Sequence, residues 1–206
     1  MTRTFSSFLL ISFIGISLGA WSQKEAAIRW SGTITYAAEA TNVPPEGLDY
    51  LPTSVVLETD GKNFRIVETG TDFERIWLIN DEEAHVLFHF LGHAVELLEI
   101  CPNSRPVSVE NRGGMKEIAG VKGALCRRAT GWAVEAETLG VAPCLWPTAW
   151  IPLQCTIEDG AAHYTLTAQT IAAVNRKDWP RKHFDIPTGY EPVDRITLST
   201  LISSIH

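Results

Sequence analysis

The stretch ERIWLINDEEAHVLFHFL, residues 74–91, decides the fold. It contains two apolar runs, Glu74–Ile79 and His85–Leu91, which are separated by the polar residues Asn80–Glu83. Short runs of large apolar residues joined by a polar turn predict a β-hairpin. Both runs carry such residues at successive positions, so we expect something to cover each face of the sheet at this hairpin.

Similar runs occur on both sides of this hairpin. Apolar and polar residues alternate in Arg29–Tyr36, which is typical of a half-buried strand. The separators are too short for helical crossovers, so neighbouring strands should be antiparallel. We predict a mainly β fold of about eight to ten strands, a single curved antiparallel sheet that forms an incomplete, half-open barrel with few or no long helices. The further strands are Ser54–Glu58, Asn63–Glu68, Ala94–Ile100, Ala124–Ala129, Trp132–Glu137 and Tyr164–Val174.

A proline-containing segment, Thr138–Gln154, is the predicted cover for the concave side of this sheet. That side of a curved sheet can hold side chains, a plugging segment or an apolar ligand. Seven tryptophans and eight phenylalanines are available to fill the core or to line a cavity. Because aromatic rings dominate core burial in ordinary domains, we expect most of them to fill the core.

The first residues have the composition of an export signal. Arg3 precedes the apolar run Phe8–Leu18, which is too short to span a bilayer and is followed by small residues. Cleavage after Ala20, Ser22 or Gln23 fits this pattern. We expect residues 1–23 to be a signal peptide and residues 24–206 to form a single domain without a transmembrane segment.

This start predicts a periplasmic or secreted protein that is soluble after cleavage. A lipoprotein would carry a cysteine just after Leu18-Gly19-Ala20, where this chain has Trp21, so we expect no lipid anchor. The chain has 24 acidic and 17 basic residues and a net charge of -7, which disfavours nucleic acid as a partner.

The four cysteines predict disulfides, since thiols oxidise outside the cytoplasm. Three pairings are possible. We favour Cys144 with Cys155, because they enclose a short loop with two prolines, and then Cys101 with Cys126. No Cys-x-x-Cys occurs, so the spacings match no zinc site.

Three histidines, His85, His89 and His93, recur at every fourth position. On a helix they would share one face and could hold a metal ion. On a strand, residues four apart lie ~13 Å from each other, whereas metal-ligand bonds are ~2 Å long. Because the pattern predicts strands, we expect these histidines not to share a metal ion. A metal-binding protein that uses His85, His89 and His93 is a weaker alternative.

The sequence contains no Gly-x-Ser-x-Gly elbow, no His-Glu-x-x-His and no glycine-rich phosphate loop. His183 and Asp185 lie two apart, which is more typical of a hydrogen-bonded surface pair. The acidic run Asp81–Glu83 is typical of a solvated hairpin tip. We therefore predict no catalytic residue, no cofactor and no enzymatic activity.

Two motifs carry a family resemblance: EIAGVKGALC at Glu117–Cys126 and FDIPTGY at Phe184–Tyr190. They are similar to those of an exported bacterial family of unknown function, whose members look like lipoprotein carriers of the LolA/LolB type. The resemblance extends over Trp30–Val193 and implies an incomplete antiparallel barrel around an apolar cavity. This chain departs from the pattern at Ala142–Cys155, where family members carry a segment able to form a helix.

These observations predict an exported protein that binds or carries a lipid-like or acylated hydrophobic ligand in the cell envelope. The alternative is a non-enzymatic interaction or structural protein whose barrel is filled and which recruits a partner through a strand edge or an aromatic patch. An apolar cavity larger than ~300 Å3 would favour the ligand-carrying protein. A filled interior would favour the interaction or structural protein. The candidate cavity residues are Trp30, Ile34, Tyr36, Leu57, Ile66, Trp77, Ile79, Phe88 and Phe90.

Overall fold

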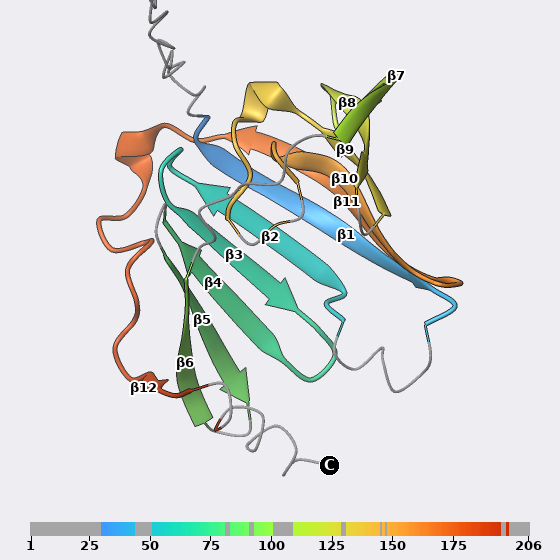
Figure 1. Cartoon of the computed structure of the whole chain (residues 1–206). Helices are drawn as coiled ribbons and strands as arrows, with labels where there is room; N and C mark the ends of the chain where they lie inside the picture. The colour runs from blue at the N-terminus through green and yellow to red at the C-terminus, as the bar shows by residue number, and fades with distance from the viewer. Residues whose placement is uncertain are drawn as a thin grey trace, which may run out of the picture.

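In the computed structural model of the protein, the chain forms one curved sheet of twelve strands that does not close on itself (Figure 1). The predicted mainly β, antiparallel architecture is confirmed. Within the described part of the chain the helical structure consists of two short 3-10 turns, Glu137–Leu139 and Arg176–Asp178, and the single α-helical residue Thr197. The structure describes residues 30–43, 51–80, 83–90, 93–100, 109–128, 131–144, 146, 148–194 and 197, so the predicted signal peptide lies outside it.

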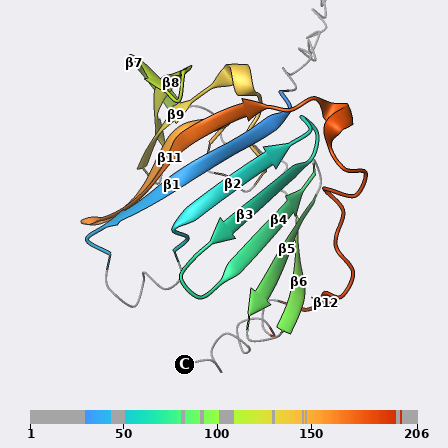
Figure 2. The same cartoon turned by 180° about the vertical axis from the view of Figure 1, so that it is seen from behind.

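The strands form two meanders that share a seam. β1 to β6 follow one another outward from the seam, and β7 to β11 return to it from the opposite edge, so that β1 pairs with β11 (Figures 1 and 2). β12 adds to β6 in parallel, and the other strand pairs among the described residues are antiparallel. The strands are β1 Gly32–Thr41, β2 Ser54–Thr59, β3 Phe64–Thr69, β4 Glu74–Ile79, β5 Glu83–Phe90, β6 His93–Ile100, β7 Val109–Ile118, β8 Val121–Arg128, β9 Gly131–Glu135, β10 Pro152–Asp159, β11 Ala162–Ala173 and β12 Glu191–Pro192.

The predicted number of strands was too low, because three strands lack a strong sequence signal. β7 contains two adjacent glycines and few β-formers. β10 begins at Pro152, inside the segment that was predicted to be the cover. Its proline occupies the first position of the strand, where a missing ladder bond matters least. β12 is only two residues long.

Register defines two faces of the sheet. In an antiparallel pair, directly opposed residues point to the same side. Ile34, Leu57, Ile66, Trp77, Val86 and Leu97 oppose one another in turn from β1 to β6 and define the inner face. Their neighbours Glu58, Arg65, Leu78, His85 and Leu98 form the corresponding row on the outer face.

Candidate functional site

The inner face brings most of the predicted cavity residues together. Five of them are buried in one apolar cluster, and three are half-buried and pack against the same cluster or its neighbour. None of the five is more than 3 % exposed, so they are core residues. The buried five are Ile34, Tyr36, Leu57, Ile66 and Ile79; the half-buried three are Trp30, Trp77 and Phe88; Phe90 lies in β5, and its side chain is outside the described ones.

A segment of the same chain covers this inner face. Residues 137–144, 146 and 148–151, which we call the cover segment, run in front of β1 and β2 in Figure 1. The segment folds back on itself: Ala142 N donates to Ala149 O (3.1 Å) and Ile151 N donates to Gly140 O (3.0 Å). Leu139 and Ile151 are buried in the inner-face cluster. The predicted cover is therefore confirmed, although it ends where β10 begins.

A buried carboxylate fixes the returning end of the cover segment. Glu135, the last residue of β9, is 2 % exposed. Its Oε2 accepts hydrogen bonds from the backbone amides of Ala149 (3.2 Å) and Trp150 (3.1 Å). This single side chain therefore ties the cover segment to the sheet.

Tyr36 supports the cover segment from β1. Its hydroxyl donates to the carbonyl oxygen of Pro152 at 2.8 Å. Its ring meets Trp146 edge-on, with 6.0 Å between the ring centroids. Burial, followed by the nearby Cys155, raises the pKa of the Tyr36 phenol well above its ordinary value. The phenol thus remains a neutral hydrogen-bond donor at physiological pH.

The inner face also carries a polar group. Glu68 pairs with Arg75, and the indole nitrogen of Trp77 donates to the same carboxylate oxygen at 2.9 Å. The Arg75 guanidinium lies 5.6 Å from the ring centroids of Phe73 and Trp77. These contacts satisfy the Arg75 cation within the protein.

A second surface lies on the outer face, beneath residues 175–190, which we call the strap. Trp179 holds the strap to the start of β1, because its Nε1 donates to Ser31 Oγ at 3.0 Å. The Trp179 ring stacks on His183 with centroids 4.7 Å apart, and Phe184 meets both rings edge-on. The strap is therefore a fixed feature of the structure over this stretch.

Glu58 is the point at which the strap meets the sheet. Its Oε2 lies 3.0 Å from His183 Nε2 and 2.6 Å from an Arg65 guanidinium nitrogen. The expected surface pair of His183 with Asp185 is therefore wrong: the histidine bonds to a carboxylate 125 residues away in sequence. Sequence spacing carried no signal for this contact.

Two adjoining hollows lie between the strap and the outer face. One has a volume of about 380 Å3 and the other about 250 Å3. Leu78 and Asp185 line both of them. The larger hollow is lined by Arg65, Ile76, Leu78, Leu87, Pro180, Lys182, His183, Asp185 and Pro187, and the smaller by Asn63, Leu78, Ile79, Asn80, His85, Phe184, Asp185 and Ile186.

The spaced histidines lie on strands, as predicted. His85 Nδ1 lies 2.6 Å from Glu96 Oε1, and its Nε2 lies 3.4 Å from Glu83 Oε1. The side chains of His89 and His93 are outside the described ones. Among the side chains that the structure describes, no three potential ligands gather around a common point.

The predicted disulfide pairing is not formed. Cys126 and Cys155 are buried thiols, so neither the Cys144–Cys155 nor the Cys101–Cys126 bridge is present, and Cys101 lies outside the described residues. Both thiols oppose Ala133 from opposite sides, which places them two strand spacings apart. That separation is about 9.5 Å between Cα atoms, beyond the ~7 Å that a disulfide can bridge.

Comparison with known proteins adds no identification. No protein-family model matches the chain, and no curated protein matches it. None of the helices in the described ranges has the length and apolar character that crossing a membrane requires.

Proposed function

We propose that the chain is a non-enzymatic interaction or structural protein of the cell envelope, with a half-barrel filled by its own cover segment. The observation that supports this most is the burial of the inner face. Ile34, Leu57 and Ile66 are completely buried, in a cluster that includes Leu139 and Ile151 of the cover segment. A ligand could enter there only if the segment moved.

The envelope location and the LolA-like class belong to the same proposal. The apolar run at Phe8–Leu18 supports export, and the motif at Phe184–Tyr190 supports the resemblance to an exported family. The curved, unclosed antiparallel sheet agrees with the barrel implied by that resemblance. A filled interior would distinguish this protein from a carrier with an open cavity.

Glu135→Ala tests the filled interior. Removing this carboxylate leaves two partly buried backbone amides without their acceptor, which should loosen the cover segment and lower the stability by roughly 1–3 kcal/mol. We expect the wild type to purify without lipid in native mass spectrometry and to leave the fluorescence of N-phenylnaphthylamine unchanged. The Ala variant should gain fluorescence on binding the same probe.

Two further variants control this experiment. Glu137→Ala removes an exposed acid two residues away and should leave the wild-type behaviour unchanged. Glu135→Gln retains an oxygen acceptor of the same shape and should restore much of the closure. Stoichiometric lipid on the wild type, or saturable probe binding to it, would contradict the proposal.

A ligand-carrying role is the second candidate, and the larger outer hollow favours it. Its volume of about 380 Å3 falls in the range of small-molecule sites, roughly 300–1,000 Å3. Ile76, Leu78 and Leu87 supply apolar side chains beneath the strap. If the wild type bound an acyl probe and lost it in His183→Ala, but not in Glu135→Gln, this candidate would replace the first.

A further inference from the structure

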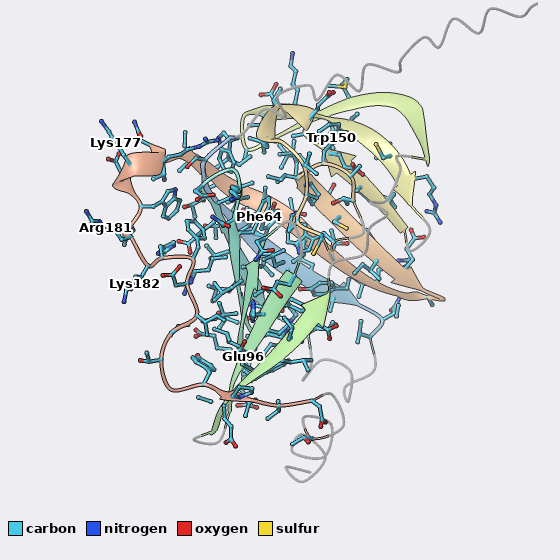
Figure 3. The ribbon with its side chains drawn as sticks, turned by 60° about the vertical axis from the view of Figure 1, so that its left-hand side comes forward. Phe64, Glu96, Trp150, Lys177, Arg181 and Lys182 are labelled. Atoms are coloured by element: carbon cyan, nitrogen blue, oxygen red, sulfur yellow. The ribbon has the colours of Figure 1, made fainter. Side chains whose placement is uncertain are left out.

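Three basic side chains stand together on the strap. Lys177, Arg181 and Lys182, which we call the basic ridge, are all exposed. Figure 3 shows them extending from the strap away from the sheet. Residues 176–187 carry four basic and two acidic side chains, Asp178 and Asp185, so this stretch is locally positive on a chain whose net charge is -7.

The ridge differs from the basic residues of the sheet. Arg65, Arg75 and Arg127 each form an ion pair with a glutamate of a neighbouring strand. No ion pair within the described part of the chain involves a residue of the ridge. These charges can therefore bind an external partner without breaking an ion pair inside the described part of the protein.

Apolar residues that are partly exposed lie on the same strap, where Ile186, Pro180 and Pro187 also line the hollows beneath it. Ile186 is 39 % exposed, although it is a large apolar side chain. Pro180 and Pro187 are also exposed on the strap. Basic side chains next to exposed apolar ones are the combination that peripheral proteins use at a membrane surface, where cations meet anionic headgroups and apolar groups enter the interface.

The strap is also held in place before any partner arrives. Trp179 bonds to Ser31, and His183 bonds to Glu58, so anchors lie on both sides of Arg181. A fixed ridge loses less conformational entropy on binding than a free segment would.

We propose that the basic ridge docks the protein onto a membrane surface that contains anionic phospholipid headgroups. The inference deepens the proposed interaction role and rests on it, since it names the partner. Each basic residue near such a surface contributes about 1 kcal/mol, so the ridge supports weak, salt-sensitive binding. Screening by salt should therefore release the protein.

The test is co-sedimentation of the full chain with vesicles of phosphatidylglycerol and phosphatidylcholine, compared with pure phosphatidylcholine vesicles. The double variant Arg181→Glu/Lys182→Glu reverses two ridge charges. The matched control Lys116→Glu/Lys122→Glu makes the same charge change at exposed positions of the β7–β8 hairpin. The wild type and both variants carry the same apolar N-terminal segment, so any contribution of this segment to vesicle binding is the same in all three proteins.

We expect the wild type to prefer the anionic vesicles and to lose that preference in about 0.5 M salt. The ridge variant should lower the partition coefficient at least about tenfold, and the hairpin control less than about twofold. Free glycerol phosphate should not release the protein, and Ile186→Ser should weaken binding to a lesser degree.

Equal loss in the hairpin control, no preference for anionic vesicles, or binding to heparin without binding to vesicles would overturn the inference. Failure of the proposed function has a different signature: lipid or probe uptake by the wild type. Docking to vesicles does not change the uptake of lipid or probe by the purified protein. Failure of the docking inference can therefore be distinguished from failure of the proposed function.

Discussion

At the scale of single residues, Tyr36 joins three parts of the molecule. It lies in β1, its hydroxyl bonds to Pro152 at the start of β10, and its ring contacts Trp146 of the cover segment. Burial, then Cys155, raises the pKa of the Tyr36 phenol. The residue therefore links the closure of the inner face to the protonation state of one phenol.

Tyr36→Phe should destabilise the protein by about 1 kcal/mol near neutral pH, the typical net value of one buried hydrogen bond. The sign of the pH dependence follows from the raised pKa. The unfolded phenol ionises near its ordinary value of about 10, before the folded one does, so the stability of the wild type is complete below that pH and declines above it. Urea titrations on either side of pH 10 should show a smaller decline in the variant.

An equal decline in both proteins would contradict this assignment to Tyr36. Tyr164→Phe is a matched comparison for the hydrogen bond, because Tyr164 also donates to a backbone oxygen, that of Pro52. Burial, followed by the nearby Glu68, raises the pKa of the Tyr164 phenol as well, so this variant should also show a smaller decline than the wild type.

At the scale of elements, the β7–β8 hairpin depends on its two-residue turn. Ala119 and Gly120 both have positive φ, 50° and 78°. A turn with positive φ at both central positions matches the twist of the flanking strands. Ala119 and Gly120, which belong to the motif at Glu117–Cys126, therefore form the turn that leads into β8.

Gly120→Ala should cost about 1 kcal/mol, because an L side chain disfavours the left-handed region. No atom lies within 4 Å of the position of the added Cβ, so the cost is conformational. Gly114→Ala in the same hairpin meets only ordinary contacts and is the matched control. Thermal unfolding monitored by circular dichroism measures the stability of both variants. An equal loss of stability in the two variants would show that the turn conformation at Gly120 is not the cause.

At the scale of the whole molecule, β1 and β11 hold the two meanders together. They pair over ten positions with one irregularity at Thr35/Tyr36. The inner-face cluster crosses this seam, since it contains Ile34 from β1 and Val134 from β9. The two meanders therefore share one core.

A shared core predicts one cooperative unfolding transition. Ile34→Ala at the seam should lower the stability by roughly 2–5 kcal/mol and still leave a single transition. Far-UV circular dichroism and tryptophan fluorescence should coincide, because Trp77 and Trp132 report on the two meanders. Separate midpoints would show that the meanders unfold independently.

The outer face shows why part of the candidate site escaped prediction. The apolar alternation around Ile34 and Leu57 is local in the sequence, so it identified inner-face residues correctly. The Glu58 contact with His183 joins segments 125 residues apart, and no local pattern specifies such a contact. The predicted cysteine pairing failed for a similar reason: the spacing of the cysteines in the sequence does not show that Cys126 in β8 and Cys155 in β10 remain buried thiols.

The sequence by itself determined the mainly β, antiparallel architecture and the cover over the concave side, because side-chain periodicity and short turns act locally. Only the tertiary structure decided that the inner face is filled by the cover segment, that Glu135 and Tyr36 hold it there, and that the strap closes over the outer face. Those outcomes depend on which distant strands meet, and burial between them is a property of the whole sheet.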